Sequence, residues 1–425
     1  RSWRAGWPGW QRRWDHGLRC CGGNVGRKFY FHDPLRPEWR WRSRRAGGAG
    51  GTGAPELGGL VGSGGPGGDG GAAGTPAFGP QVFGIECDAN DKCTLSANTV
   101  GMIDARSAVV PGGFGGTGGT GGNGGDGFTA GPGGPGGRAG QGGNGSQGGL
   151  ARGILLSSNS ILTNNLVYSI YGGAGAPGGY GGNGGNGGDG GSGFFQGNGG
   201  DGGDGATGGR GGGNGSALGV SFLSQFSAYV ILVNNTIAQV FYGEGQGAGG
   251  LGGFGGSGGS GVILGLDGND GAAGAAGQPG ETIGLHANAN SIKLVNNILA
   301  LSPVGRSRPA GLFGITIGVF SFDPNVVFIA DYNDVYGWEE QYLPQTLLLG
   351  RHSISADPKF LNVNSANFRL NSSSPAINAG AKSFPGVTIP AYDILNIARP
   401  QGTGVDLGAY EFILKLFAPL IYRSP

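Results

Sequence analysis

Between residues 323 and 340 the sequence gathers side chains that could bind or cleave a sugar polymer. They are carboxylates and one indole: Asp323, Asp331, Asp334, Trp338, Glu339 and Glu340. Two carboxylates can act as general acid and base on a glycosidic bond, and the indole could serve as a platform for a sugar ring. Acidic residues at turns are also commonly plain solvated positions. A lyase or hydrolase would further need an Arg or Lys base. We therefore treat the cluster as a candidate carbohydrate contact and assign no catalytic residue.

Calcium binding is a second chemistry that the residue spacing suggests. The segment "GGNGGDGFT" (121–129) fits the nonapeptide G-G-x-G-x-D-x-U-x of calcium-binding rolls. Such rolls need tandem copies, and the related segments at 184–192 and 199–207 have Gly191 and Ala206 at the apolar position. The aspartates of these segments are expected to be solvated. Calcium stays an alternative, with no metal ligands and no other cofactor assigned.

Two cysteines in "ECDANDKC", Cys87 and Cys93, are candidates for a disulfide that closes a small loop. Such a bond would suit an extracellular protein. Two free thiols in a hairpin are the alternative. No second Cys/His pair lies nearby, so the pattern does not indicate zinc.

Short runs of mostly apolar residues interrupt three long glycine-rich blocks, and each interruption is a candidate turn. These residues are Phe128, Thr129, Phe194, Phe195, Gln196, Val262, Ile263, Leu264 and Leu266. Exposed apolar side chains gathered in one place usually mark an interaction surface. Packing of the same residues on one another, to close the end of a bundle, is the alternative.

The elements that must position these residues are repeated strands. Five segments, at 84–103, 153–170, 219–240, 284–301 and 314–337, each show two short apolar alternations separated by a polar turn. Each second alternation carries a marker asparagine: Asn98, Asn165, Asn235, Asn297 and Asn333. One unit cannot bury its apolar face alone, whereas stacked units can. The sequence therefore predicts an all-β fold, a right-handed parallel β-helix, in preference to a β-sandwich with long loops. The residues expected to face inward include Val233, Ile237, Val295, Leu299, Ile315 and Ile317.

The glycine-rich blocks are predicted to leave one corner of this solenoid. They cover 111–149, 171–217 and 243–282, each starting soon after a marker asparagine, and a further block covers 46–80. Glycine with period three is typical of polyproline-II-type helices, and arms of 16–19 residues would span roughly 50–60 Å. The pattern resembles the polyglycine-II bundles of glycine-rich antifreeze proteins and phage tail-tip adhesins, and the repeats of PE-PGRS surface proteins. Disordered loops are the alternative.

The stretch 357–412 carries the most specific signature. Its elements include "DPKF", "NFRL", "SPAINAG", "YDIL", "ARP" and "VDLGAYE" in that order. This resembles the end of bacterial choice-of-anchor Q proteins, although Asn396-Ile397-Ala398 departs from the family's usual Gly-Asn-Pro. The resemblance implies a secreted right-handed parallel β-helix and no particular activity. We expect the stretch to cap the open end of the helix, with Arg399 and Asp406 as a structural ion pair and Arg369 and Glu411 as further candidates for that role.

Composition completes the sequence-based hypothesis. The net charge is +1 with 12% charged residues, which does not favour nucleic acid. Residues 1–45 hold eleven Arg, one Lys and three acids, a net +9, and six of the seven Trp. We interpret that segment as an out-of-frame glycine repeat rather than a binding arm, and 413–425 as an apolar tail too short to cross a membrane. The expected function is a secreted or cell-surface structural or adhesive protein that binds a surface, a glycan or a protein, with self-association open. The alternatives are a β-helix polysaccharide lyase or hydrolase, and a calcium-binding repeat protein.

Overall fold

The computed structural model describes most of the chain between residues 49 and 413. The described residues are 49–53, 62–73, 79–87, 92–106, 118, 121, 123–124, 126, 128–223, 228–301, 316–321, 326–344, 347 and 350–413. The expectations for 1–45 lie outside them, as do those for 414–425 of the tail. Within this part of the chain the structure is built from β-strands and extended segments, with one short 3₁₀ turn, η1 (Val363–Ser365).

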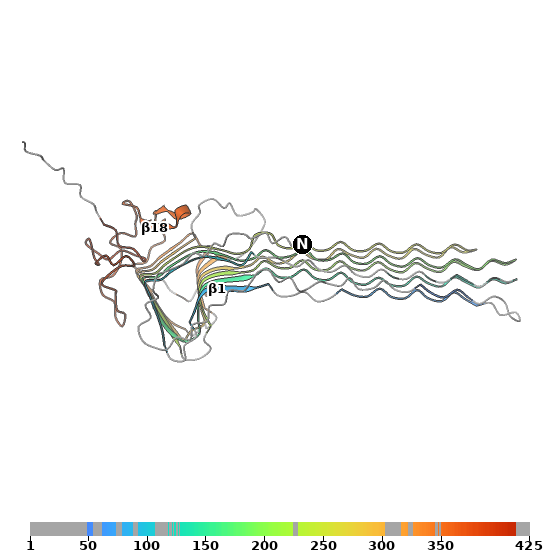
Figure 1. Cartoon of the computed structure of the whole chain (residues 1–425), viewed down its shortest axis with the longest axis horizontal. Helices are drawn as coiled ribbons and strands as arrows, with labels where there is room; N and C mark the ends of the chain where they lie inside the picture. Colours follow the sequence, from blue (N-terminus) through green and yellow to red (C-terminus); the bar gives the residue numbers. More distant parts are fainter. Residues whose placement is uncertain are drawn as a thin grey trace, which may run out of the picture.

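The strands of successive coils pair into three parallel sheets, which together form a β-helix (Figure 1). This confirms the predicted fold class. Sheet 1 contains β1 (Gln81–Cys87), β4 (Leu150–Leu156), β7 (Ala217–Phe222), β10 (Thr282–Ala287), β13 (Thr316–Phe320) and β16 (Glu340–Leu343). Sheet 2 contains β2 (Lys92–Ser96), β5 (Asn159–Thr163), β8 (Tyr229–Val233), β11 (Ser291–Val295) and β14 (Val327–Asp331). Sheet 3 contains β3 (Thr99–Asp104), β6 (Leu166–Tyr171), β9 (Thr236–Phe241), β12 (Ile298–Ala300) and β15 (Asp334–Tyr336). Neighbours in each sheet are three strands apart in sequence, so each of the first five coils contributes one strand to each sheet, and β16 adds a sixth strand to sheet 1.

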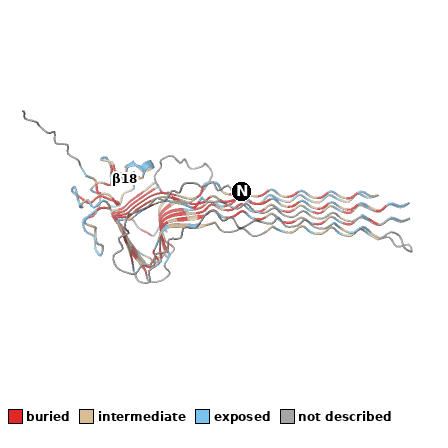
Figure 2. Ribbon diagram, in the orientation of Figure 1, coloured by how far each residue is buried: buried red, intermediate tan, exposed pale blue. Residues whose placement is uncertain are grey.

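The interior of the solenoid is an apolar cluster to which all three sheets contribute (Figure 2). Ile237 and Leu299 belong to it, as predicted. Val233 and Val295 are buried but do not belong to this cluster, and Ile317 belongs to a separate one. Ile315 lies outside the described residues. The preceding residues, Leu232 and Leu294, point inward. Because successive side chains of a strand point to opposite faces, Val233 and Val295 lie on the outer face.

The five marker asparagines form a continuous hydrogen-bonded ladder along one corner. From Asn165 onward, each Oδ1 accepts both the backbone N–H and the side-chain amide of the preceding coil's asparagine; the two bonds from Asn165 to Asn235 Oδ1 are each 2.9 Å. The ladder extends from Asn98 to Asn333. The left-handed backbone that the turn requires belongs to the residue before each asparagine, such as Asn164 with φ 53°.

The glycine-rich segments leave the solenoid between sheet 3 and sheet 1 and run side by side in one direction (Figure 1). The second and third inserts each run outward and return as two arms. The arms lie at 172–191 and 197–215 in the second insert and at 243–261 and 265–280 in the third. The described part of the first insert has its return arm at 130–149. Backbone N–H groups bond to neighbouring arms with a period of three residues, as from Gly200 to the Gly188 carbonyl at 2.8 Å.

Close approach of the arms explains their glycine content. A Cβ on Gly203 would lie 2.1 Å from the carbonyl oxygen of Gly137, and one on Gly256 would lie 2.0 Å from that of Gly185. Neither glycine is among those with positive φ. Glycine is therefore needed at these positions because there is no room for a Cβ, and not because of the backbone torsions.

The C-terminal segment packs against the outer face of sheet 3. It includes β17 (Phe360–Asn362) and β18 (Asn367–Leu370). Phe368 packs on Leu166 and Ala238, which belong to two successive coils. These contacts lie along the side of the solenoid, and the role of an end cap stays a prediction. Trp338, Tyr342 and Leu347 extend the interior cluster at the last coil.

A buried ion pair holds this C-terminal segment together, with a partner different from the one expected. Arg399 Nη1 lies 2.8 Å from Glu411 Oε2, and each side chain is 1% exposed. The guanidinium also donates to the carbonyl of Asp406, while the Asp406 carboxylate accepts the backbone N–H of Asn378 and Phe412. Arg369 is exposed and takes no part. The pair is structural, as predicted, but Glu411 replaces Asp406 as the partner of Arg399.

Candidate functional site at the tip of the arms

Three phenylalanines from two neighbouring turns cluster at the far end of the arms. The rings of Phe128 and Phe194 stack with centroids 5.4 Å apart, and Phe195 meets Phe194 edge-on at 5.1 Å. Backbone bonds fix the two turns, because Phe195 N–H donates to Phe128 O at 3.0 Å and Ala130 N–H donates to Phe195 O at 2.9 Å. The rings nevertheless stay 57–78% exposed. They pack on one another and still face solvent.

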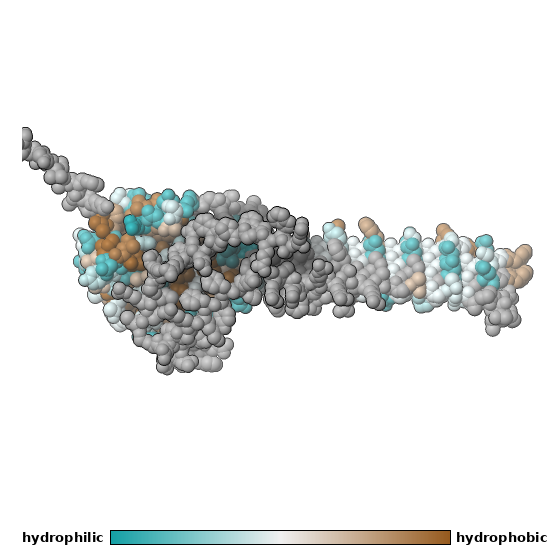
Figure 3. Space-filling model, in the orientation of Figure 1, coloured by the Kyte–Doolittle hydropathy of each residue, from teal (hydrophilic) through white to brown (hydrophobic). Residues whose placement is uncertain are grey.

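The third turn brings aliphatic residues to the same end. Val262 N–H donates to Gly197 O at 3.1 Å, and Gly199 N–H donates to Ile263 O at 2.9 Å. Val262, Ile263 and Leu264 are each exposed, and Figure 3 shows the apolar end of the bundle. Together with the phenylalanines they form an exposed apolar surface, here called the tip surface. The predicted turns therefore do meet, while their role in binding stays a prediction.

Other members of the predicted set lie at the margins of this surface. Thr129 and Gln196 are exposed polar residues within the turns, and Thr129 pairs with Phe195 in an isolated parallel bridge. Leu266 is exposed just after the third turn. The tip surface is therefore bordered by a few polar side chains.

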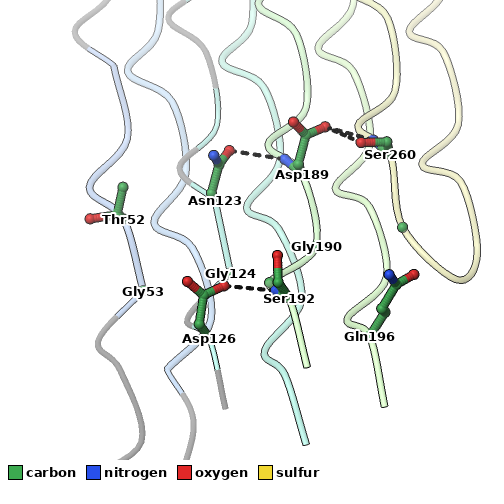
Figure 4. A pocket seen from close by; sticks show the side chains of 12 residues that line it. Thr52, Gly53, Asn123, Gly124, Asp126, Asp189, Gly190, Ser192, Gln196 and Ser260 are labelled. Atoms are coloured by element: carbon green, nitrogen blue, oxygen red, sulfur yellow. Dashed lines mark hydrogen bonds between the residues drawn. The ribbon is translucent and has the colours of Figure 1, made fainter. Parts of the chain in front are cut away.

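A polar groove of about 820 Å³ lies beside the tip surface on one face of the arms (Figure 4). Its side chains form a ladder between arms: Asn123 Oδ1 accepts Asp189 N–H at 3.0 Å, and Asp189 Oδ1 accepts the Ser260 N–H at 2.8 Å. Asp126 Oδ1 likewise accepts the N–H of Ser192 at 2.7 Å. The hydroxyl of Ser260 also bonds to Asp189 and lowers the pKa of that carboxyl. The groove offers hydrogen-bond acceptors next to apolar rings.

These bonds give the aspartates of the nonapeptide-like segments a role in the arms. The N–H groups of several outward residues bond to a side-chain oxygen from the adjacent arm instead of to a backbone carbonyl. Asp201 and Asp204 do this for Leu266 and Asn269 at 2.9 Å each. No group of three or more His, Cys, Asp or Glu suited to a metal occurs in the part of the chain that the structure describes.

The structure separates the acidic residues of 323–340. Asp331 bonds to His352 Nδ1 at 2.8 Å; burial raises the pKa of Asp331, but the hydrogen bonds from the ring and backbone of His352 lower it below its usual value overall. Asp334 is fully buried, and burial raises its pKa to about 7. Glu339 is exposed and Glu340 half-buried, whereas Asp323 lies outside the described residues. These positions do not form one surface cluster.

Trp338 is not an exposed sugar platform, and that interpretation is wrong. Its side chain belongs to the interior cluster and its indole N–H donates to Leu299 O at 2.9 Å. A short apolar alternation precedes the residue, but no local pattern indicates that its side chain turns inward. The contact between Asp331 and His352 was also missed, because 21 residues separate them and no motif links them.

Cys87 and Cys93 are joined by a disulfide bond, with their sulfur atoms 2.07 Å apart. Both are buried in the interior cluster at the first coil. The described part of the chain holds no helix with the length and hydropathy needed to cross a membrane.

Comparisons with known proteins identify no family. No family model matches the chain, and no curated protein matches it. Among solved structures, the pectate lyase Pel9A is 16% identical with a TM-score of 0.21, covering 71% of this chain and 73% of that one. A springtail antifreeze protein from Granisotoma rainieri, a bundle of nine polyproline type II helices, is 22% identical with a TM-score of 0.07. It covers 48% of this chain and 92% of its own. At these TM-scores neither likeness carries an argument, and the fold rests on the strand pairing.

Proposed function

We propose that this protein is a surface scaffold whose β-helix holds a rigid set of glycine-rich arms, and whose tip surface adheres to a partner. The observation that carries the proposal is the cluster of Phe128, Phe194 and Phe195, exposed at the end of hydrogen-bonded arms. Two neighbouring turns bring these three rings together at the end of the bundle, where they meet solvent. Exposed apolar patches commonly mark interaction sites, and aromatic residues are favoured anchors.

We further propose that the arms form a polyglycine-II bundle. Period-three glycine, backbone bonds at every third residue and spacing that excludes a Cβ support this geometry. At a rise of about 3.1 Å per residue, the arm 197–215 would extend roughly 60 Å. A bundle of this kind places the tip surface far from the solenoid at a fixed position, which lowers the entropy cost of binding.

A glycan is the partner class that we favour. Aromatic rings offer flat faces for the apolar side of a sugar, and the adjacent groove supplies the acceptor oxygens of Asp126 and Asp189 for hydroxyl groups. Export to the cell surface or medium is supported by the disulfide and by the resemblance of 357–412 to choice-of-anchor Q proteins. A protein surface with an apolar pocket is the competing partner.

Polysaccharide cleavage and calcium binding have less support. The first would draw on carboxylates that are instead bound to His352 or buried, as Asp331 and Asp334 are. The second would draw on aspartates whose oxygens accept backbone N–H groups between arms.

The test replaces two rings of the tip surface. Protein-coated beads are measured for retention on wells bearing mucin glycoproteins, with octyl-coated wells as an apolar probe. Burying a phenylalanine contributes about 1.5–3 kcal/mol, so Phe194→Ser with Phe195→Ser should reduce affinity at least about a hundredfold. Phe254→Ser is the matched control, because this ring is equally exposed but lies on the side of an arm.

Thermal unfolding separates binding from packing. We expect the double variant to unfold at the wild-type temperature while its retention falls. Unchanged retention on both surfaces would contradict the proposal. A loss of stability that parallels the loss of retention would make the tip surface a packing plug instead. Retention on octyl groups without retention on mucin would favour the protein partner over the glycan.

A further inference from the structure

The last arm of the bundle departs from the glycine pattern of the others. In the arm 197–215, glycine fills two of every three positions over much of its length, as in "GNGGDGGDG". In the arm 265–280, "GLDGNDGAAGAAGQPG", it fills one of three. Hydrogen-bond register aligns the two arms, because Leu266 N–H bonds to Asp201 Oδ1 and Gly202 N–H to Leu266 O. The replaced positions are therefore equivalent to specific glycines of the inner arm.

The equivalent inner glycines face a neighbouring arm at close range. Gly202 and Gly205 correspond to Asp267 and Asp270. A Cβ on Gly202 would lie 1.9 Å from Gly256 O, and one on Gly205 would lie 2.2 Å from Gly253 O. In the last arm, the side chains of Asp267 and Asp270 therefore lie on the side that, in the inner arm 197–215, contacts the next outgoing arm.

The same two aspartates also take over the hydrogen bonds of that missing neighbour. In the outgoing arm 172–191, Gly184 and Gly187 donate their N–H groups to carbonyls of the next outgoing arm at 2.8 Å. The equivalent glycines of the arm 243–261 are Gly255 and Gly258. They donate to the Oδ1 atoms of Asp270 and Asp267, also at 2.8 Å. The carboxylates stand where the carbonyls of a further arm would lie.

We infer that Asp267 and Asp270 close this edge of the bundle against a glycine-rich arm from a second copy of the chain. An open edge would present backbone donors with glycine spacing, which is the problem that sheets face at their edge strands. Here the donors are occupied, the flanking positions carry Ala273 and Ala276, and an incoming arm would meet two negative charges. Self-association through this edge is blocked, so the arms that one chain supplies set the width of the bundle there.

The test opens the edge. Asp267→Gly, Asp270→Gly, Ala273→Gly and Ala276→Gly are combined, and molar mass is measured by sedimentation over a hundredfold concentration range. We expect the fourfold variant to gain mass with concentration relative to the wild type. The control, Asp201→Gly with Asp204→Gly, adds glycine on the face of the bundle and should keep the wild-type mass. Equal mass for the fourfold variant and the wild type at every concentration would overturn the inference.

A second measurement needs no variant. Amide exchange in the wild type should be slow at Gly255 and Gly258, whose N–H groups bond to the aspartates. It should be fast at Gly252, which aligns with Ala273 and has no hydrogen-bond acceptor among the described residues. Equal exchange at all three glycines would refute the role given to the carboxylates, whether or not the fourfold variant folds.

Discussion

The asparagine ladder provides the sharpest test of how the coils are held together, and Asn235→Ala is the informative change. Asn235 Oδ1 accepts the backbone N–H and the side-chain amide of Asn165, each at 2.9 Å. Its own amide donates to Leu162 O at 2.8 Å and to Asn297 Oδ1 at 3.0 Å. Asn235 is 1% exposed and Asn165 is fully buried, so water cannot replace these partners.

The expected cost follows from the groups that alanine would leave without partners. The buried N–H of Asn165 would lose its acceptor, at about 1–3 kcal/mol, and the further hydrogen bonds contribute about 1 kcal/mol each. The total is about 4 kcal/mol. Asn98→Ala is the matched control, because Asn98 is half-buried at the start of the ladder. Asn165 Oδ1 would still accept the Asn98 backbone N–H, so the cost there is about 1 kcal/mol.

Urea unfolding followed by circular dichroism gives the two free energies of unfolding. Amide exchange then shows where the coils open, which matters because stacked coils can melt in parts. In Asn235→Ala, exchange should increase in β5 and β8 before it does elsewhere. A destabilisation no larger than that of Asn98→Ala would refute the argument that the ladder holds the coils through buried, mutually satisfied amides.

Two other predictions concern the arms and one buried carboxyl. Gly203→Ala should loosen the arms, because its Cβ would lie 2.1 Å from Gly137 O, whereas Gly51→Ala should have no effect, since its Cβ would meet nothing within 4 Å. Amide exchange of the arm glycines distinguishes the two variants. Equal exchange in both would contradict the argument that the close approach of the arms requires glycine. Burial raises the pKa of Asp334 to about 7, so the folded state holds a proton that the unfolded state releases above about pH 4. Stability should therefore fall as pH rises from 4 to 7 and level off above, by about 3 kcal/mol between pH 5 and 8, and Asp334→Asn should lose that decrease in urea unfolding at the two pH values. A variant that keeps the wild-type pH dependence would refute the assignment.

Much of the architecture was predictable because it is local and repeated. Alternating apolar residues define strands wherever they occur, and recurrence of Asn165, Asn235 and Asn297 at one place in each coil indicates stacking. The period of three in the glycine blocks predicted extended arms, and their constant position predicted a common corner. Such patterns need no knowledge of distant contacts, since each repeat meets mainly its neighbours.

The remaining features depend on contacts between segments that no local pattern connects. Phe368 covers the outer face of sheet 3 because that face is apolar, which the alternation of single strands does not reveal. Trp338 turns into the interior, where its indole packs against Gly284 and Gly318, which have no side chains. Arg399 pairs with Glu411 because the fold of the C-terminal segment buries both.

The amino-acid sequence by itself determined the coils, the ladder of asparagines and the glycine period. Each is a short-range repeat in which the residue type indicates the local backbone conformation and whether the side chain points inward or outward. Tertiary structure alone decided which arm lies at the edge. The aspartates of 265–280 look like the other solvated acids of the glycine blocks. They become edge-closing groups because no further arm follows among the described residues. Gly255 and Gly258 there have N–H groups that need an acceptor, and there is room for a side chain to reach them.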